Sequence, residues 1–261
     1  MSETVPAQYN IKLPPTQKEL PCDDGIPMET ARHKAQMDLL METLSTWLNA
    51  RDDGFVGGNM FIYFSLAQVR NQDFRGPDFF AVLDVPKGER LSWVVWEEGK
   101  APDVVIELIS ESTKERDKNE KKRIYQNQMR VPEYFWYDPF NPDDWAGFAL
   151  QNRVYRPITP NHRNQLISES LGLILLRWEG RYHGIEATWL RWATLEGELL
   201  LTDGEMRDRE KSAKELAQQR AAQLESQLQQ VVRNLRAQEM TVAQIASITG
   251  LSATQIEAIS P

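Results

Sequence analysis

The sequence predicts a mixed α/β domain followed by a helical tail. Residues 102–139 have the order strand, helix, strand, which is that of a βαβ unit. After Gly204 the composition shifts to Ala, Gln, Glu, Lys, Arg and Leu, residues that favour helix. We therefore expect three parts: a flexible N-terminal arm at 1–26, a globular domain at 27–203 and a tail at 204–261.

The first elements follow from composition and periodicity. Residues 1–26 are rich in proline and polar side chains and carry few large apolar ones, which is typical of a loosely ordered arm. From Pro27 to Ala50, apolar residues recur at helical spacing. Residues 52–54, Asp-Asp-Gly, end this predicted helix.

Strands are expected to follow. From Phe55 to Trp96, short aromatic and aliphatic runs alternate with turn-forming segments, which predicts a meander of strands. The nearly continuous apolar run PDVVIELIS, residues 102–110, predicts a central strand that is covered on both faces. A polar, helix-favouring stretch leads to the next strand, VPEYFWYDP. Residues 145–192 predict several more strands, which we expect to extend the edge of the sheet.

The tail predicts a coiled coil. Apolar residues alternate steps of four and three along it, a period of about 3.5 residues. These residues are Ala217, Ala221, Leu224, Leu228, Val231 and Leu235. A dimerising stalk is the expected role, and a helix that packs back on its own domain is the alternative. Two short helices follow, separated by Gly250-Leu251, with Ser252 as the N-cap of the second.

Composition limits the class of protein. The chain has 261 residues, 41% of them hydrophobic, which suits one sizeable core and excludes collagen-like and wholly disordered proteins. No apolar run is long enough to span a membrane and the N-terminus does not resemble a signal peptide, so we expect a cytoplasmic protein. Cys22 is the only cysteine and there are three histidines, so a metal site would be built from carboxylates and would favour Mg²⁺ or Mn²⁺.

The net charge of −8 is unevenly distributed. Residues 204–261 contain seven acidic and seven basic residues, so the whole excess lies in 1–203. Within that part, residues 114–123 carry six basic residues against three acidic ones and offer a local basic face. From Ala237 to Pro261 there is no Lys or Arg, which argues against a DNA-binding role for the two short helices and favours self-association or docking of a partner.

Three segments contain residues suited to hydrolytic chemistry. Asp78 begins a predicted strand, Glu107 lies inside the apolar run, and Asp117 and Lys121 share one face of the next helix. Hydrolysis of a phosphodiester with a hard metal ion needs carboxylates to hold the ion and a cation to stabilise charge. A buried acid such as Glu107 needs a partner or a metal. Lys121 has a second interpretation, an ordinary ion pair with Asp117 on a solvated helix face.

These motifs resemble one known family. The run from Pro77 to Pro139 is similar to the Uma-two family of restriction endonucleases, within the PD-(D/E)XK nuclease superfamily. The similarity covers about 60 residues strongly. It rests on the matching positions Asp78, Glu107, Ser110, Asp117, Lys121, Tyr125, Glu133 and Tyr134.

The resemblance implies a restriction-endonuclease-like mixed sheet flanked by helices, and a metal-dependent endonuclease that acts on DNA. It implies that Asp78 and Glu107 bind Mg²⁺ or Mn²⁺ and that Asp78, Glu107 and Lys121 are catalytic. Ile109 occupies the position of the superfamily's usual lysine, so the resemblance implies a lysine that has migrated to Lys121. The resemblance also implies that Glu29 or His33, on the first predicted helix, completes the site.

Further candidates and other functions stay open. Asp103, in a second proline-aspartate pair, points to the same face as Glu107 in a regular strand and is a rival or accessory ligand, as is Asp117. Tyr125 and Tyr134 are expected to be core residues. Two other functions are compatible with the sequence: a catalytically inactive scaffold that uses the nuclease fold for binding, and a regulator that acts through the tail.

Overall fold

The computed structural model describes residues 13–22, 28, 30–71 and 76–259. The chain divides into two compact units, Met1–Asp203 and Gly204–Pro261. Among the helices within the described ranges, none is both long and apolar enough to cross a membrane.

The first unit is built on a six-stranded mixed sheet in the order β1-β3-β5-β6-β7-β8. Its strands are β1 (Asp53–Gly57), β3 (Phe79–Pro86), β5 (Val104–Leu108), β6 (Glu133–Tyr137), β7 (Trp145–Gln151) and β8 (Val154–Pro157). The parallel pair is β5 and β6, and the other neighbours are antiparallel. The predicted βαβ unit is confirmed, and every residue of β5 is buried.

Two smaller sheets differ from the predicted topology. Instead of joining one meander, β2 (Ile62–Tyr63) and β4 (Trp93–Val94) pair in parallel with each other. Strands β9 (Leu166–Ser168), β10 (Leu173–Tyr182) and β11 (Ile185–Ala193) form a separate antiparallel sheet, so only β7 and β8 extend the main sheet. Pairing between distant strands is not fixed by local periodicity, which explains both differences.

Helices of the first unit are α1, α2, α3 and the helix between β5 and β6. Their bounds are α1 (Ala31–Leu48), α2 (Leu66–Asn71), α3 (Val95–Glu98), and the π-helical segments η1 (Arg116–Lys121) and η2 (Tyr125–Met129) on either side of α4 (Lys122–Ile124). Thr30 caps α1 by accepting a hydrogen bond from the backbone N–H of His33, as expected of an N-cap threonine.

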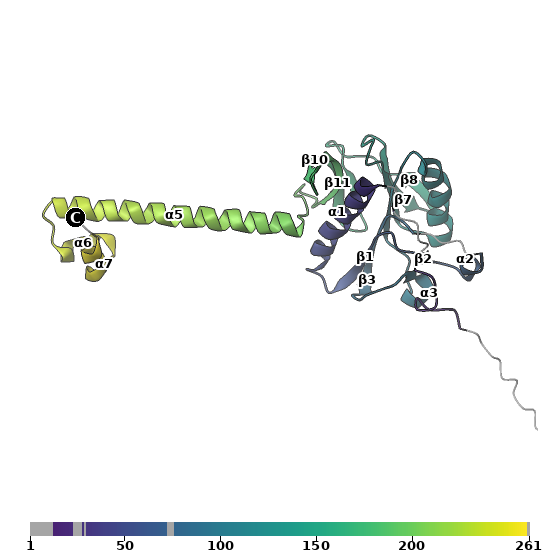
Figure 1. Ribbon diagram of the computed structural model, residues 1–261, viewed down its shortest axis with the longest axis horizontal. Coiled ribbons are helices and arrows are strands. Elements are labelled where there is room, and N and C mark those ends of the chain that lie inside the picture. Colours follow the sequence, from purple (N-terminus) through teal and green to yellow (C-terminus); the bar gives the residue numbers. More distant parts are fainter. Residues whose placement is uncertain (1–12, 23–27, 29, 72–75, 260–261) are drawn as a thin grey trace, which may run out of the picture. The chain divides into compact units, whose positions relative to one another are not determined.

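Side chains of the main sheet alternate between two cores, and Figure 1 shows helices on opposite sides of the sheet. On one face, Ile106 and Phe135 pack with Leu40 of α1 and Trp192 of β11. On the other face, residues of β3, β5 and β6 pack against the helix between β5 and β6; they include Phe80, Val105, Ile124, Tyr125 and Tyr134. The helix that carries Lys121 therefore covers the face of β5 from which Glu107 projects.

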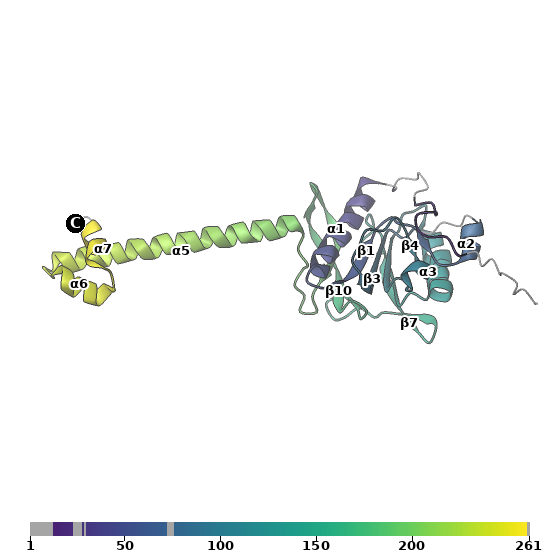
Figure 2. The same cartoon turned by 90° about the horizontal axis from the view of Figure 1, so that it is seen from below.

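Helix α1 is joined to β11 by polar contacts as well as by apolar packing. The buried side chain of Gln36 donates to the carbonyl of Leu190 and accepts from its backbone N–H, both at 2.9 Å. The hydroxyl of Tyr182, the last residue of the neighbouring strand β10, donates to Glu42 of α1 at 3.1 Å. Figure 2 shows α1 beside the β9–β11 sheet. These bonds fix the N-terminal helix to a strand near the end of the unit.

Residues 13–22, part of the predicted arm, contact the domain. Leu20 is buried with Phe61 and Tyr63, and Trp96 donates its indole N–H to the carbonyl of Pro15 at 2.8 Å. This segment therefore covers part of the small β2–β4 sheet.

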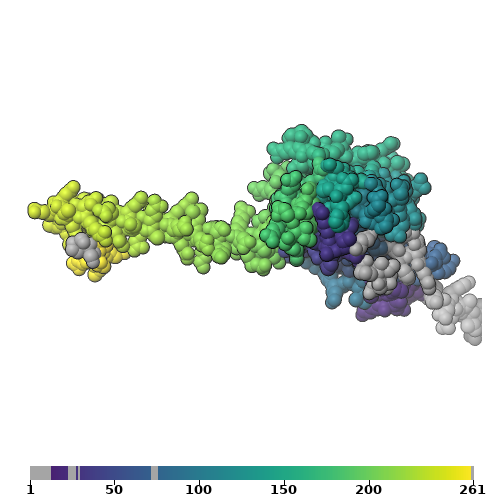
Figure 3. Space-filling model, turned by 45° about the horizontal axis from the view of Figure 1, so that its top comes forward, coloured from purple at the N-terminus to yellow at the C-terminus, as the bar shows by residue number. Residues whose placement is uncertain are grey.

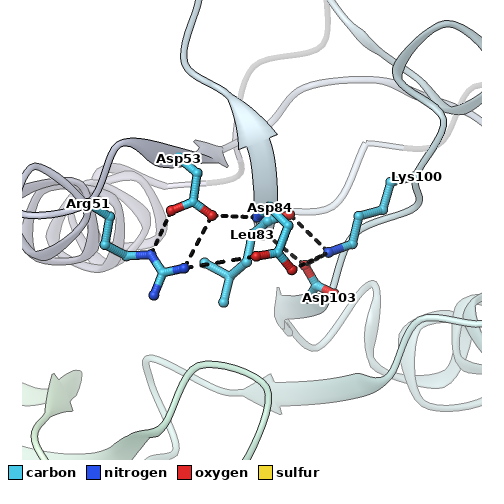
Figure 4. A network of polar contacts seen from close by, with 6 residues as sticks. All are labelled: Arg51, Asp53, Leu83, Asp84, Lys100 and Asp103. Atoms are coloured by element: carbon cyan, nitrogen blue, oxygen red, sulfur yellow. Dashed lines mark hydrogen bonds and ion pairs between the residues drawn. The ribbon is translucent and has the colours of Figure 1, made fainter.

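A polar network joins β1, β3 and the start of β5 (Figure 4). The guanidinium of Arg51 binds Asp53, whose carboxylate also accepts from the backbone N–H of Asp84 at 2.8 Å. Lys100 donates to the carbonyl of Leu83 and pairs with Asp103 at 2.9 Å. Asp103 also accepts from the backbone N–H of Leu83 at 2.7 Å, so its carboxylate is committed to this end of the sheet.

The second unit consists of the long helix α5 (Asp203–Ala237) and the short helices α6 (Val242–Thr249) and α7 (Ala253–Ala258). Helix α5 begins at Asp203, one residue before the start of this unit. The predicted cap of the last helix is confirmed, since Ser252 forms a capping box with Gln255. Val232, Ile245 and Ile256 form a small core. Arg236 donates to the carbonyls of Ile256 and Ile259 at the end of α7. Figure 3 shows this bundle at the C-terminal end of the chain.

We expect Gly147→Ala to destabilise the first unit by about 1–3 kcal/mol, because overpacking shifts side chains off their preferred rotamers. A Cβ at Gly147 would lie 2.6 Å from the ring of Phe135, its partner across the β6–β7 pair. Urea unfolding measures this loss. Gly88→Ala is the control, since its Cβ meets only Arg90 at 3.9 Å; equal stability of the two variants would contradict the prediction.

Candidate active site

The helix between β5 and β6 directs every fourth residue toward the sheet. Asp117, Lys121, Tyr125 and Met129 are all buried, although their neighbours Asn119 and Arg123 are exposed. An α-helix turns every 3.6 residues, and π-helical turns, closed by bonds to the fifth residue, are wider. Because the helix mixes the two, its repeat is about four residues and these four side chains stay aligned.

Two carboxylates face this helix from neighbouring strands. Phe79 pairs with Ile106 in the antiparallel β3–β5 ladder, so continuing the register by one residue places Asp78 across from Glu107. The carboxylate of Asp78 accepts from the backbone N–H of Leu108 at 2.7 Å. Glu107 is fully buried, whereas Asp78 is half-buried. Asp78 is therefore the more exposed residue of the pair.

Glu107 is held by two donors from the helix. The ammonium group of Lys121 donates to Oε2 of Glu107 at 2.9 Å, and the hydroxyl of Tyr125 donates to Oε1 at 2.6 Å. Lys121 is 9% exposed, so the structure contradicts the interpretation of Lys121 as a residue of a solvated face. Tyr125 positions Glu107, a role that the sequence analysis missed. The feature that could have revealed this role is the position of Tyr125 four residues after Lys121, on the same face of the helix.

Asp117 contributes a third carboxylate, which is buried. Its Oδ1 atom lies 2.8 Å from the ammonium group of Lys121, in an ion pair without hydrogen-bond alignment. Its backbone carbonyl accepts from the hydroxyl of Tyr134 at 2.9 Å. Tyr134, which stacks near Tyr125, therefore supports the helix at this position and is more than a core residue.

Three acids with one lysine give the site an excess of negative charge. Burial, and then the neighbouring carboxylate of Glu107, raise the pKa of Asp78 well above its usual range. Burial also raises the pKa of Glu107, against the opposing effect of Lys121. Burial alone would lower the pKa of Lys121, but Glu107, Asp117 and Asp78 together raise it. Lys121 is therefore a permanent cation beside two carboxyl groups, those of Asp78 and Glu107, that resist ionising together.

The donor set fits a hard divalent cation. A carboxylate offers about four lone-pair sites, and Lys121 and Tyr125 occupy two of those on Glu107. Among the described residues, no three His, Cys, Asp or Glu side chains gather closely enough to bind a metal by themselves. Mg²⁺ often takes only one or two protein carboxylates and fills its remaining positions with water and substrate phosphate. Asp78 and Glu107 are the residues that would hold it.

The structure does not bring the other candidate ligands to this group. Asp103 lies at the opposite end of β5, in the network with Lys100 described above. His33 lies on α1, on the other side of the sheet, where Nδ1 is 2.9 Å from the hydroxyl of Thr30 and Nε2 is 3.4 Å from the carbonyl of Ile109. Glu29 lies outside the described residues. Ile109 is fully buried.

Ser110 and Glu133, the remaining residues of the motif, have local structural contacts. The backbone N–H of Ser110 donates to the hydroxyl of Thr113 at 3.0 Å, just before the helix begins. Glu133 accepts from the hydroxyl of Ser168 and from the backbone N–H of Ser170, and so joins the main sheet to the β9–β11 sheet.

Comparison with known proteins agrees with the motif. The sequence model of the Uma-two family, described as "Putative restriction endonuclease", matches residues 7–179. The chain therefore belongs to this family. It is also similar to the crystal structure of a putative nuclease from Anabaena variabilis, with 16% identity and a TM-score of 0.38 over 56% of this chain and 84% of that one. No curated protein matches the chain.

We expect the contribution of Asp78 and Glu107 to the stability of the metal-free protein to fall as pH rises above about 4, the usual pKa of free Asp and Glu. A carboxyl group whose pKa is raised by folding binds its proton more tightly in the folded chain than in the unfolded one. Its contribution to the free energy of unfolding is therefore complete at low pH and is lost as pH rises through the folded pKa. The substitution Asp78→Asn removes the pH-dependent loss of stability that the Asp78 carboxyl causes, and it keeps an oxygen that can accept from the backbone N–H of Leu108. Urea unfolding in EDTA should show that this variant gains stability over the wild type with rising pH; parallel profiles would contradict the prediction.

Proposed function

We propose that this protein is a metal-dependent endonuclease that hydrolyses phosphodiester bonds of DNA, on a core of restriction-endonuclease type. Membership of the Uma-two family supports the reaction class. The observation that carries the proposal is the buried group of Asp78, Glu107, Asp117 and Lys121, whose charge a divalent cation would balance.

Each residue has a role that follows from its contacts. Asp78 and Glu107 bind Mg²⁺ or Mn²⁺, which when bound would supply positive charge at the phosphoryl group and favour deprotonation of water. Lys121 remains protonated and stabilises negative charge that develops on the phosphate. Tyr125 orients Glu107, and Asp117 holds Lys121 from the other side.

We propose that DNA approaches the site at Asp78, its most exposed member. Only part of the basic run at 114–123 is available to phosphates, because Lys114 and Lys118 form ion pairs with Asp144 and Lys121 points inward. Arg116 and Arg123 are exposed and are the residues of this run best placed to meet the DNA backbone. We further propose that residues 204–261 join two copies, so that two sites could address two strands.

Plasmid cleavage tests the proposal. We expect the wild-type protein to nick supercoiled DNA with Mg²⁺ and Glu107→Gln to reduce the rate by about 100-fold or more, the scale of removing one electrostatic group from a reacting centre. Asp103→Asn is the matched control, since it changes a carboxylate on the same strand outside the group. Undiminished cleavage by Glu107→Gln would contradict the assignment.

Metal binding gives a second test that does not depend on activity. Mg²⁺ at 100 times its dissociation constant should stabilise the wild-type protein by about 2.7 kcal/mol. The same addition should leave the stability of Glu107→Gln nearly unchanged. Thermal unfolding with and without Mg²⁺ measures the difference, and an equal effect of Mg²⁺ on both proteins would place the metal elsewhere.

One observation favours the alternative of a catalytically silent binding protein. Both carboxylate oxygens of Glu107 already have a donor within hydrogen-bond distance, so the group is partly satisfied without a metal. If this alternative holds, calorimetry will detect no Mg²⁺ binding and the wild-type protein will leave plasmid DNA intact.

A further inference from the structure

Helix α5 changes character along its length. In its first part, charges lie four residues apart in opposite pairs, as in Glu210 with Lys214 and Lys211 with Glu215, the spacing that stabilises a single helix in water. No such pair occurs among residues 217–235. This part instead carries an apolar stripe, formed by Ala217, Ala221, Leu224, Leu228, Val231 and Leu235. The first part therefore suits an isolated helix, and the second part suits a helix with a neighbour.

The apolar stripe of the second part is largely exposed. The side chain of Leu224 is 66% exposed and that of Val231 is 44% exposed. In α5 only Val232 is buried; it faces the small core with α6 and α7 and lies outside the stripe, whose last residue, Leu235, packs against the same core. Steps of three and four assign Ala221, Leu228 and Leu235 to heptad position a, and Ala217, Leu224 and Val231 to position d.

Two charges beside the stripe determine which neighbour fits. Arg220 occupies position g and Glu225 position e of the next heptad. Neither has an oppositely charged residue three or four positions away, so neither has a partner on its own helix face. In a parallel, in-register coiled coil, each g residue meets the e residue of the following heptad on the other chain. Arg220 of each copy would then pair with Glu225 of the other.

The groove on the e side suits this arrangement. It measures about 500 Å³ and is lined by Leu224, Glu225 and Leu228 of α5 together with Leu251 and Ile259. A second copy on the stripe would direct its g residues to this side. The aliphatic part of Arg220 would cover the apolar wall, and its guanidinium would reach Glu225.

We infer that residues 217–235 form a parallel, in-register, two-stranded coiled coil with a second copy of this chain, oriented by the reciprocal Arg220–Glu225 pairs. This inference specifies the dimer of the proposed function and rests on it. Its tests measure mass and cross-linking, so it can fail while cleavage is observed and can hold while cleavage is absent.

Matched substitutions test the apolar stripe. Sedimentation equilibrium should show a dimer of the full chain, with at least about tenfold weaker association for Leu224→Glu, since each burial of a charge in place of leucine costs more than 1.4 kcal/mol. Leu216→Glu introduces the same charge on the same helix outside the stripe, where Leu216 is 47% exposed, and should leave the dimer intact. A monomeric wild-type protein, or equal effects of the two variants, would overturn the inference.

Charge exchange tests the orientation. Arg220→Glu should weaken the dimer about threefold to tenfold, the range for two exposed pairs turned repulsive. Adding Glu225→Arg should restore it, because the exchanged charges pair again in the parallel register. Failure of the double variant to recover would overturn the parallel arrangement.

Cross-linking tests the register directly. In a Cys22→Ser background, Ala217→Cys and Leu228→Cys should each form a disulfide with the same position of the second copy, since equivalent seam positions lie within disulfide distance. Leu216→Cys should not. Disulfides that form only when the Ala217→Cys and Leu228→Cys proteins are mixed would indicate an antiparallel pair and overturn the inference.

Discussion

The fold places three carboxylates, two of them fully buried, around one ammonium group, and the surrounding elements keep them there. Glu107 lies on the central strand, Asp78 across from it on β3, and Asp117 and Lys121 on the helix that covers this face. Ionising these acids without compensation is costly in a protein interior. The hydroxyl of Tyr125 and the backbone N–H of Leu108 reduce that cost, and in the proposed function a divalent cation would balance the remaining charge.

Much of this arrangement could be predicted from residue patterns. An acid inside the apolar run of β5 indicated a site on the central strand, and the helix that follows offered Asp117 and Lys121 on one face. The direction of that face was not predictable, because it depends on π-helical turns that hold Asp117, Lys121 and Tyr125 in line. Periodicity of 3.6 residues describes Tyr125 as a core residue, whereas its hydroxyl binds Glu107.

The pairing of distant strands was the second feature that could not be predicted from the sequence. The strands expected within residues 53–96 are present, but β2 and β4 pair with each other in parallel, and β9–β11 form their own sheet. Local sequence gives no register between segments so far apart. The same limit applies to Asp103: strand periodicity places it on the face of Glu107, yet its carboxylate is bound by Lys100 and by the backbone N–H of Leu83 at the other end of β5.

The two hydrogen bonds between Gln36 and Leu190 have a kinetic consequence. They join residues 154 positions apart, and the apolar face of α1 packs beside them. During synthesis on the ribosome, α1 emerges long before β11, so the side of α1 that carries Gln36 has no partner strand until nearly the whole domain has been made, although its other contacts, with the main sheet, can form earlier. Contacts of such sequence separation slow folding, because the closure of a long chain segment must precede them. The side of the nascent helix that faces β11 thus stays exposed until the end of the domain is translated.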